Sequence, residues 1–171
     1  MRKISLHKTI SWMETLDLLR QLGAPPKGVK SVYGPGRSGR LLAEMFAKLH
    51  GLDVKDYPHD ADLFIDDTVL TGRTYFRLRD AFPDKPFWAL VWHCGRMYPH
   101  RLRDLQGKPV TETILHRGQE VSRIKVNRRF QMGPQDKGVL IDPRHHVFFP
   151  MKQPGIHALD GGHLVDQLMA S

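Results

Sequence analysis

The chain has 171 residues, of which 40% are hydrophobic and 26% charged, a composition typical of one compact domain with a single hydrophobic core. No apolar run approaches the ~18 residues of a membrane span and no signal-peptide pattern is present, so we expect a cytoplasmic protein without membrane contact. The lone Cys94 excludes an internal disulfide and a thiol-rich structural zinc site.

Most of the formal net charge of +8 is concentrated in one fifth of the chain, between residues 96 and 129. This basic region contains only three acids, Asp104, Glu112 and Glu120. Its nine bases are Arg96, Arg101, Arg103, Lys108, Arg117, Arg123, Lys125, Arg128 and Arg129. Such a field attracts polyanions, so contact with nucleic acid is one interpretation. A solvated basic face is the other.

Strands and helices alternate in the first half of the chain. Ser11 and Glu14 have capping-box spacing before a periodic apolar run that stops at Gly23, which predicts a helix. The elements expected after it are a loop over 24–28, a strand over 29–33, a glycine-rich loop over 34–39, a helix over 40–50, a brief strand over 52–54, a strand over 63–65, a loop over 66–74, a helix over 75–82 and a strand over 87–92. This β–α–β order predicts an α/β fold with a parallel sheet, right-handed crossovers and helices on both faces.

The pattern loosens after Cys94. Strands are expected over 112–115, 123–126, 139–141 and 147–149, with a helical turn or two over 163–169. The simplest arrangement of these strands is a small antiparallel appendage. We therefore divide the chain into an α/β core over residues 1–95 and a basic, mostly β appendage over 96–171, packed together as a single compact domain.

The segment 66–74 carries the clearest chemistry. A buried strand delivers Asp66 and Asp67 to its carboxyl end, where open α/β sheets bind ligands. The backbone N–H groups and hydroxyls that follow, at the start of a helix, form a phosphate cradle. The phosphate-binding residues expected here are Thr68, Leu70, Thr71, Gly72, Arg73 and Thr74. The two carboxylates can accept hydrogen bonds from ribose hydroxyls or hold the hydration shell of Mg²⁺.

This segment resembles the phosphoribosyl pyrophosphate motif of the type I phosphoribosyltransferases: an apolar strand, two acids, three variable residues and Thr-Gly-x-Thr. The resemblance implies a phosphoribosyltransferase-like core, Mg²⁺ as cofactor, and phosphoribosyl pyrophosphate with a nucleobase or nucleotide as ligands. It also implies that Asp66 and Asp67 are the catalytic and metal-holding residues. A carboxylate pair that binds metal in an unrelated α/β fold is the alternative.

An upstream glycine-rich segment stands where the same family has its pyrophosphate-binding loop. Its residues are Gly34, Pro35, Gly36, Arg37, Ser38 and Gly39. The glycines expose backbone N–H groups, and Arg37 can face a diphosphate. The spacing of Gly34 and Gly39 also resembles a P-loop. However, Arg40 and Leu41 replace the Lys and Ser/Thr that a P-loop needs for phosphates and magnesium.

A third segment, His146, Val147 and Phe148 before Phe149-Pro150, resembles the hood strand of the 6-oxopurine phosphoribosyltransferases. There an aromatic residue four positions before the proline stacks on the nucleobase. His146 holds that position here, and Phe148 lies on the same face of the strand. A strand that only packs the appendage is the alternative.

Two departures from the family limit what the resemblance implies. Only Gly51–Ala61 separates the second helix from the next strand, which is too short for a long closing loop, so closure would come from the basic region or from a partner subunit in a homo-oligomer. Leu70 stands where 6-oxopurine enzymes have an acid, and leucine cannot act as a general base. The sequence therefore supports two hypotheses, which are a phosphoribosyltransferase and a non-catalytic nucleotide-binding regulator with nucleic-acid contacts.

Overall fold

The computed structural model describes residues 6–93, 104–125, 132–141, 145–153, 155 and 159–171. Its strands and helices in chain order are β1 (Leu6–Thr9), α1 (Trp12–Leu22), β2 (Ser31–Tyr33), α2 (Gly36–His50), β3 (Asp53–Val54), η1 (Pro58–Asp60), β4 (Leu63–Val69), α3 (Arg73–Ala81), β5 (Phe87–His93), β6 (Thr111–His116), β7 (Gln119–Ile124), β8 (Lys137–Ile141), β9 (His145–Phe148), η3 (Pro150–Lys152) and α4 (Gly161–Ala170).

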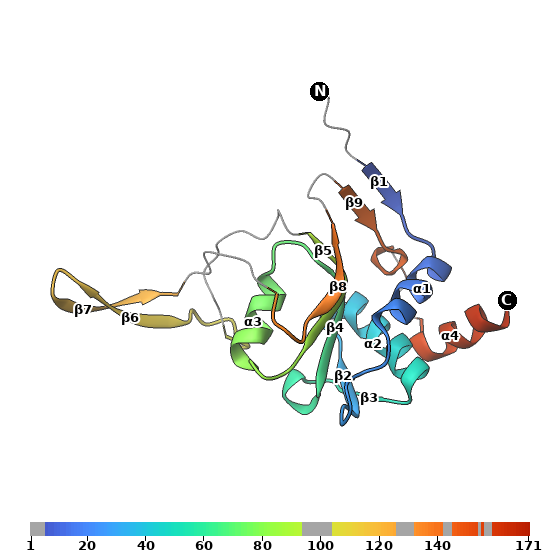
Figure 1. Ribbon diagram of the computed structural model, residues 1–171, viewed down its shortest axis with the longest axis horizontal. Coiled ribbons are helices and arrows are strands. Elements are labelled where there is room, and N and C mark those ends of the chain that lie inside the picture. Colours follow the sequence, from blue (N-terminus) through green and yellow to red (C-terminus); the bar gives the residue numbers. More distant parts are fainter. Residues whose placement is uncertain (1–5, 94–103, 126–131, 142–144, 154, 156–158) are drawn as a thin grey trace.

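A five-stranded parallel sheet in the order β3-β2-β4-β5-β8 forms the centre of the molecule. The helices α1, α2 and α4 cover one face of this sheet and α3 covers the other, as Figure 1 shows. The expectation of a mixed α/β fold with a mostly parallel sheet and helices on both faces is therefore confirmed.

The hydrophobic core is divided in two by the sheet. Successive residues of a strand point to opposite faces, so Leu63 and Ile65 of β4 pack toward α1, α2 and α4 while Phe64 packs toward α3. In β5, Trp88 belongs to the first cluster and Phe87 to the second, and all seven residues of this strand are buried. Such continuous burial is typical of a central strand in a parallel sheet covered on both faces.

The capping box predicted for the first helix is present. The Ser11 hydroxyl accepts a hydrogen bond from the backbone N–H of Glu14 at 3.1 Å, and the Glu14 carboxylate accepts one from the Ser11 N–H at 3.4 Å. The helix ends at Leu22, before Gly23, as the sequence predicted. The last helix, α4, spans Gly161–Ala170 and is longer than the one or two turns expected.

Two of the strands assigned to the antiparallel appendage pair elsewhere, so that assignment was wrong for both. β8 joins the central sheet parallel to β5, where the Nε1 atoms of Trp88 and Trp92 donate to the carbonyls of Gln135 and Lys137 at 2.9 Å each. Gly138 permits this approach, because a β-carbon there would lie 1.8 Å from the carbonyl oxygen of Ala89. These contacts come from distant residues, and no local pattern reveals them.

β9 pairs in parallel with β1, a strand that the sequence did not predict. The pairing continues past β1, where the N–H of Ile10 donates to the carbonyl of Phe148 at 2.8 Å. The Leu-His-Lys-Thr sequence of β1 is too short to show a strand period. Its extended conformation depends on a partner near the other end of the chain.

The antiparallel appendage that remains is the β6–β7 hairpin, which extends away from the sheet and helices in Figure 1. Arg117 and Gly118 have φ values of 52° and 77° at its tip, the left-handed pair of a type I′ turn. The strand expected over 123–126 ends at Ile124, and Val126 lies outside the described residues.

The described part of the basic region is nearly balanced in charge. Within 104–125, four bases (Lys108, Arg117, Arg123, Lys125) accompany three acids (Asp104, Glu112, Glu120), and Arg123 pairs with Glu112 at 2.9 Å. The other five bases of this region lie outside the described residues. Its contact with nucleic acid therefore stays a prediction.

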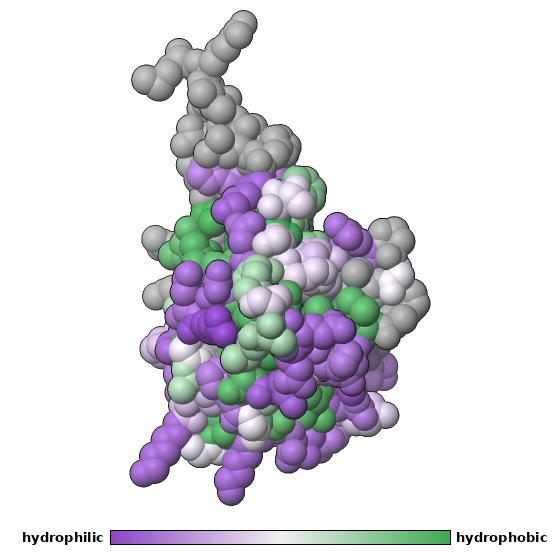
Figure 2. All heavy atoms as spheres, turned by 90° about the vertical axis from the view of Figure 1, so that its right-hand side faces the viewer, coloured by the Kyte–Doolittle hydropathy of each residue, from purple (hydrophilic) through white to green (hydrophobic). Residues whose placement is uncertain are grey.

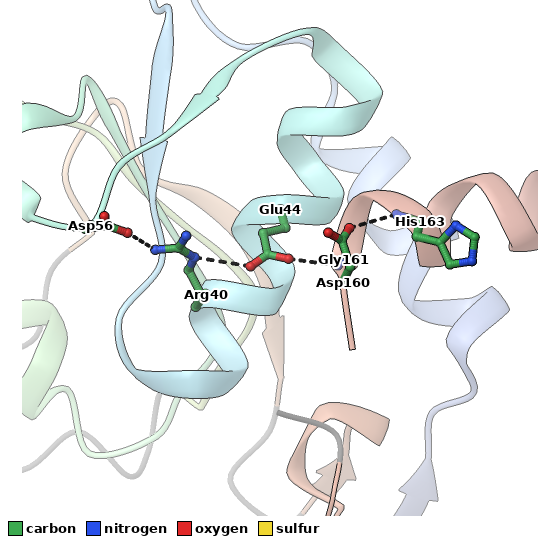
Figure 3. A network of polar contacts seen from close by, with 6 residues as sticks. All are labelled: Arg40, Glu44, Asp56, Asp160, Gly161 and His163. Carbon is green, nitrogen blue, oxygen red and sulfur yellow. Dashed lines mark hydrogen bonds and ion pairs between the residues drawn. The ribbon is translucent and has the colours of Figure 1, made fainter. Parts of the chain in front are cut away.

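A chain of polar contacts connects α2 to α4 and to the turn after β3 (Figure 3). Glu44 accepts from the Arg40 Nε at 3.2 Å and from the backbone N–H of Gly161 at 2.8 Å, and Arg40 also pairs with Asp56. The Asp160 side chain caps α4 by accepting from the N–H of His163 at 3.0 Å. Glu44 thus satisfies a buried N–H in the first turn of α4.

The side of the molecule that carries α4 has hydrophilic residues interleaved with smaller hydrophobic areas in Figure 2. Met13, Leu159 and Met169 are among the exposed large hydrophobic residues of the chain. None of the described helices combines the length and the apolar character needed to cross a membrane.

Candidate functional site

A cavity of about 830 Å³ lies where the carboxyl end of β4 meets the first turns of α2 and α3. It brings together the glycine-rich segment 34–39 and the segment 66–74, both singled out in the sequence. The sequence-predicted residues that line it are Pro35, Gly36, Arg37, Ser38, Asp66, Asp67, Thr68, Leu70, Thr71, Gly72, Arg73 and Thr74. The position is the one where open α/β sheets bind ligands.

The first segment is a helix start rather than a loop over 34–39, so the predicted boundary was wrong. α2 begins at Gly36, which makes Gly36, Arg37 and Ser38 its first turn. The helix has Pro35 as N-cap, no side-chain hydrogen bond to its first N–H groups and no acid in its first turn. Those N–H groups and the positive end of the helix dipole are therefore available to an anion.

Gly34 and Gly39 do not line the cavity but allow it to form. A β-carbon on Gly34 would lie 1.8 Å from the carbonyl oxygen of Gly39, and one on Gly39 would lie 2.9 Å from Cδ of Pro35 and 3.3 Å from Oδ1 of Asp66. Both positions are therefore closed to larger residues by close packing. The two glycines allow the start of α2 to lie against the end of β4, and their predicted role in ligand binding stays a prediction.

The second segment also differs from the expected loop over 66–74. β4 continues to Val69, so Asp66, Asp67 and Thr68 belong to the strand, and only three residues (Leu70, Thr71, Gly72) separate it from α3. β4 is longer than the predicted strand because its pairing with β5 continues from Asp66↔Ala89 to Val69↔Trp92. Gly72 has a φ of 82°, and it is an N-cap without a side-chain hydrogen bond. The start of α3 is thus a second uncapped helix N-terminus at the cavity.

Asp66 and Asp67 have different surroundings although they are neighbours. Oδ1 of Asp66 accepts from the N–H of Asp67 at 2.9 Å, and Oδ1 of Asp67 accepts from the N–H of Thr68 at 2.7 Å. Asp67 is 1% exposed, and its Oδ2 has no hydrogen-bond partner. Burial, and then the charge of Asp67, raise the pKa of Asp66 well above its ordinary value.

The carboxylate pair suits a hydrated divalent cation better than an enclosed protein cage. Among the residues that the structure describes, no group of three or more His, Cys, Asp or Glu side chains converges on a point. Mg²⁺ needs only one or two carboxylates, because it keeps several waters and takes ligand phosphates. Oδ2 of buried Asp67, which has no hydrogen-bond partner, is consistent with that chemistry.

The cavity also contains residues that the sequence did not indicate. Met151, Lys152, Gln153 and Gly155, from η3 and the chain after it, form one wall. Lys152 Nζ lies 2.9 Å from Oγ of Ser38 and 3.4 Å from Oδ2 of Asp67. Arg77 and Tyr75 from α3 complete the lining on the other side. Lys152 is isolated in the sequence, so no motif could have revealed it.

The hood segment lies apart from this cavity. His146, Val147 and Phe148 belong to β9 beside β1, and none of them is among the residues that line the cavity. Phe148 is 53% exposed, whereas Phe149 is buried in the core. From this part of the chain, it is the segment after β9 that reaches the cavity. The nucleobase role of His146 and Phe148 stays a prediction.

Two departures noted in the sequence have clear structural counterparts. The 51–61 connection holds only the short β3 and the 3₁₀ turn η1, so no long loop rises from it over the cavity. Leu70 lines the cavity and is 42% exposed. Its side chain has no atom that could accept a proton from a bound ligand. The cavity therefore lacks a long loop from 51–61 to cover a bound ligand, and it lacks a general base at position 70.

Comparison with known proteins gives no identity for the chain. Neither a protein-family model nor a curated protein matches its sequence.

Proposed function

We propose that this protein binds phosphoribosyl pyrophosphate with Mg²⁺ and transfers the phosphoribosyl group to or from a nucleobase, with pyrophosphate as co-product. One observation carries the proposal: a single cavity combines two uncapped helix N-termini with the Asp66–Asp67 pair. The ligand carries two anionic groups separated by a ribose diol. Two positive helix ends flanking a pair of hydrogen-bond acceptors match that arrangement.

Each part of the ligand has a candidate partner in the chain. The N–H groups of Arg73 and Thr74 at the start of α3 would hold the 5′-phosphate, and those of Gly36 to Ser38 would hold the pyrophosphate. Asp66 and Asp67 would accept hydrogen bonds from the ribose hydroxyls and hold the Mg²⁺ hydration shell. The bound cation would neutralise charge on the leaving pyrophosphate.

The chain's own residues would act mainly by position and charge. The developing positive charge on the ribose ring lies near the carboxylates, where a buried anion such as Asp67 stabilises it. Leu70 supplies no general base, so the acceptor nitrogen would have to be free of its proton or lose it elsewhere. The base thus remains to be identified by assay.

The test is pyrophosphate release from phosphoribosyl pyrophosphate and Mg²⁺ over a panel of hypoxanthine, guanine, xanthine, adenine, uracil and orotate. Release with one base, suppressed by Asp67→Asn, supports the proposal. Asp84→Asn, at an exposed aspartate outside the cavity, is the matched control and should leave the rate unchanged. Absence of release with every base contradicts transfer.

A second candidate is a non-catalytic regulator that binds the same ligand without turnover. The exposed Leu70 and the short 51–61 connection favour it, because both remove parts that catalysis would use. Calorimetry distinguishes the two: a regulator titrates phosphoribosyl pyrophosphate yet releases no pyrophosphate. Nucleic-acid binding that weakens steeply with salt would add the predicted partner of the basic region.

A further inference from the structure

Lys152 is the cation that neutralises the buried Asp67 in the ligand-free protein. Its Nζ lies between Oγ of Ser38 at 2.9 Å and Oδ2 of Asp67 at 3.4 Å, so the ammonium joins the first turn of α2 to the carboxylate pair. Asp67 is almost fully buried, and a buried carboxylate is costly unless a cation or hydrogen bonds compensate it. Here Oδ2 has the ion pair but no hydrogen bond.

The backbone of Lys152 is held by its buried neighbours, whereas its side chain is largely exposed. Pro150 and Met151 are buried, and the N–H of Lys152 donates to the carbonyl of Phe149 at 3.2 Å. The Lys152 side chain, in contrast, is 60% exposed. A flexible four-carbon stem on a fixed backbone can carry its ammonium from one acceptor to another without refolding.

The surroundings provide two competing anionic partners for that ammonium. One is Asp67, and the other is any anion held at the start of α2, where the ammonium already contacts Ser38. A divalent cation at the carboxylate pair would displace Lys152 by charge repulsion, since both would occupy the space beside Oδ2 of Asp67.

We propose that Lys152 is an exchangeable counter-cation that pairs with Asp67 in the free protein and with the diphosphate of the ligand in the complex. It therefore weakens binding of a divalent cation alone and strengthens binding of the anion. The cation consequently enters together with the diphosphate rather than before it. This inference rests on the proposed function, of which it specifies the order of binding.

The experiment measures two affinities separately, Mn²⁺ alone by electron paramagnetic resonance and inorganic pyrophosphate alone by calorimetry. Lys152→Met should bind Mn²⁺ about three- to tenfold more tightly than the unaltered protein, and pyrophosphate about three- to tenfold more weakly. Lys152→Arg keeps the charge and should stay within about twofold in both. Lys27→Met removes an exposed lysine outside the cavity, so it corrects for the loss of one net charge.

Opposite shifts in the two affinities, beyond those of Lys27→Met, support the exchange. Equal shifts, or no shift in either, overturn it, as does a lack of both Mn²⁺ and pyrophosphate binding in the unaltered protein. If Lys152→Met unfolds, Lys152→Gln replaces it, because the amide still donates to Ser38 and Asp67 without a charge. Failure of the proposed function is recognised separately: the unaltered protein then binds no phosphoribosyl pyrophosphate with Mg²⁺, whatever the variants do.

Discussion

The phenol of Tyr75 in α3 donates a hydrogen bond to the carboxylate of Asp136, which stands just before β8. The same carboxylate accepts from the backbone N–H groups of Gly133 at 2.8 Å and Phe87 at 3.0 Å. Burial, and then the bond to Asp136, raise the pKa of Tyr75 above its ordinary value, so the phenol stays neutral and a donor. This contact fixes the start of α3, and with it one wall of the cavity, against the sheet.

Tyr75→Phe is expected to lower the free energy of unfolding by about 1.5–3 kcal/mol, the usual range for a hydrogen bond to a charged group. Asp136 would keep its two backbone donors, so the fold should survive. Denaturant unfolding measures the change. Tyr57→Phe, at an exposed tyrosine stacked on His59, is the control and should have almost no effect. An equal loss in both variants would contradict a special role for the Asp136 contact.

Asp66→Asn is expected to stabilise the protein at neutral pH while weakening ligand binding. Burial and Asp67 raise the pKa of Asp66, so the folded state holds this proton more tightly than the unfolded chain. Stability therefore falls as pH rises from the ordinary aspartate range through the folded-state pKa. The side-chain amide of asparagine carries no charge, so the substitution Asp66→Asn removes that loss of stability. We expect the free energy of unfolding to rise by about 1 kcal/mol, which is typical of sites that trade stability for function.

Thermal unfolding at about pH 4 and about pH 8 tests the direction of this pH dependence, since the ordinary aspartate pKa is about 3.9. The variant should melt higher than the unaltered protein at the upper pH, and the difference should shrink at the lower one. Asp53→Asn, at an exposed aspartate of β3, removes one carboxylate outside the cavity and is the control for the loss of charge. A lower melting temperature for Asp66→Asn at about pH 8 would refute the argument.

Gly161→Ala and Gly162→Ala form a matched pair at the start of α4. A β-carbon at Gly161 would lie 2.6 Å from both the carbonyl oxygen of Leu41 and the β-carbon of Glu44, so α4 would be pushed away from α2. We expect a loss of about 1–3 kcal/mol. At Gly162 the nearest atom is Oδ1 of Asp160 at 3.3 Å, and alanine favours the helix, so the effect should be near zero or slightly stabilising. Differential scanning calorimetry compares the two.

Glu44→Ala tests the polar chain between α2 and α4 in Figure 3. The N–H of Gly161 would lose its acceptor in a buried position, at a cost of about 1–3 kcal/mol. Asp56→Ala removes only the exposed pair with Arg40 and should cost less than about 1 kcal/mol. Hydrogen exchange should show faster opening of α4 in the first variant alone. Equal exchange of α4 in both variants would mean that Glu44 does not hold this helix.

The sequence predicted those features that depend on neighbouring residues. The capping box of α1, the buried strands β4 and β5, and the meeting of the segments 34–39 and 66–74 at one sheet edge all follow from local pattern and from β–α–β order. The predicted boundaries of helices and strands were wrong where tertiary packing determines them. α2 starts earlier because Gly34 and Gly39 pack together, and β4 runs further because β5 continues beside it.

The remaining features depend on contacts between distant residues, which periodicity cannot indicate. β8 joins the sheet through Trp88 and Trp92, β1 depends on β9, and Lys152 meets Asp67 only once the chain after β9 has folded over α2. The two helix starts and the carboxylate pair of the cavity were therefore predictable from the sequence, but the ion pair between Lys152 and Asp67 was not. We propose that this charge compensation sets the order in which ligands bind.

The β1–β9 pair has a consequence for synthesis on the ribosome. Leu6–Thr9 precedes all five strands of the central sheet in the chain, whereas its partner His145–Phe148 follows all of them. Contacts between such distant segments form late, because closing the long loop between them costs entropy before the strand pairing contributes any stability. The first strand must therefore remain unpaired while the core assembles. The wall that brings Lys152 to the cavity follows directly after β9, so the cavity is completed only after β9 has been synthesised.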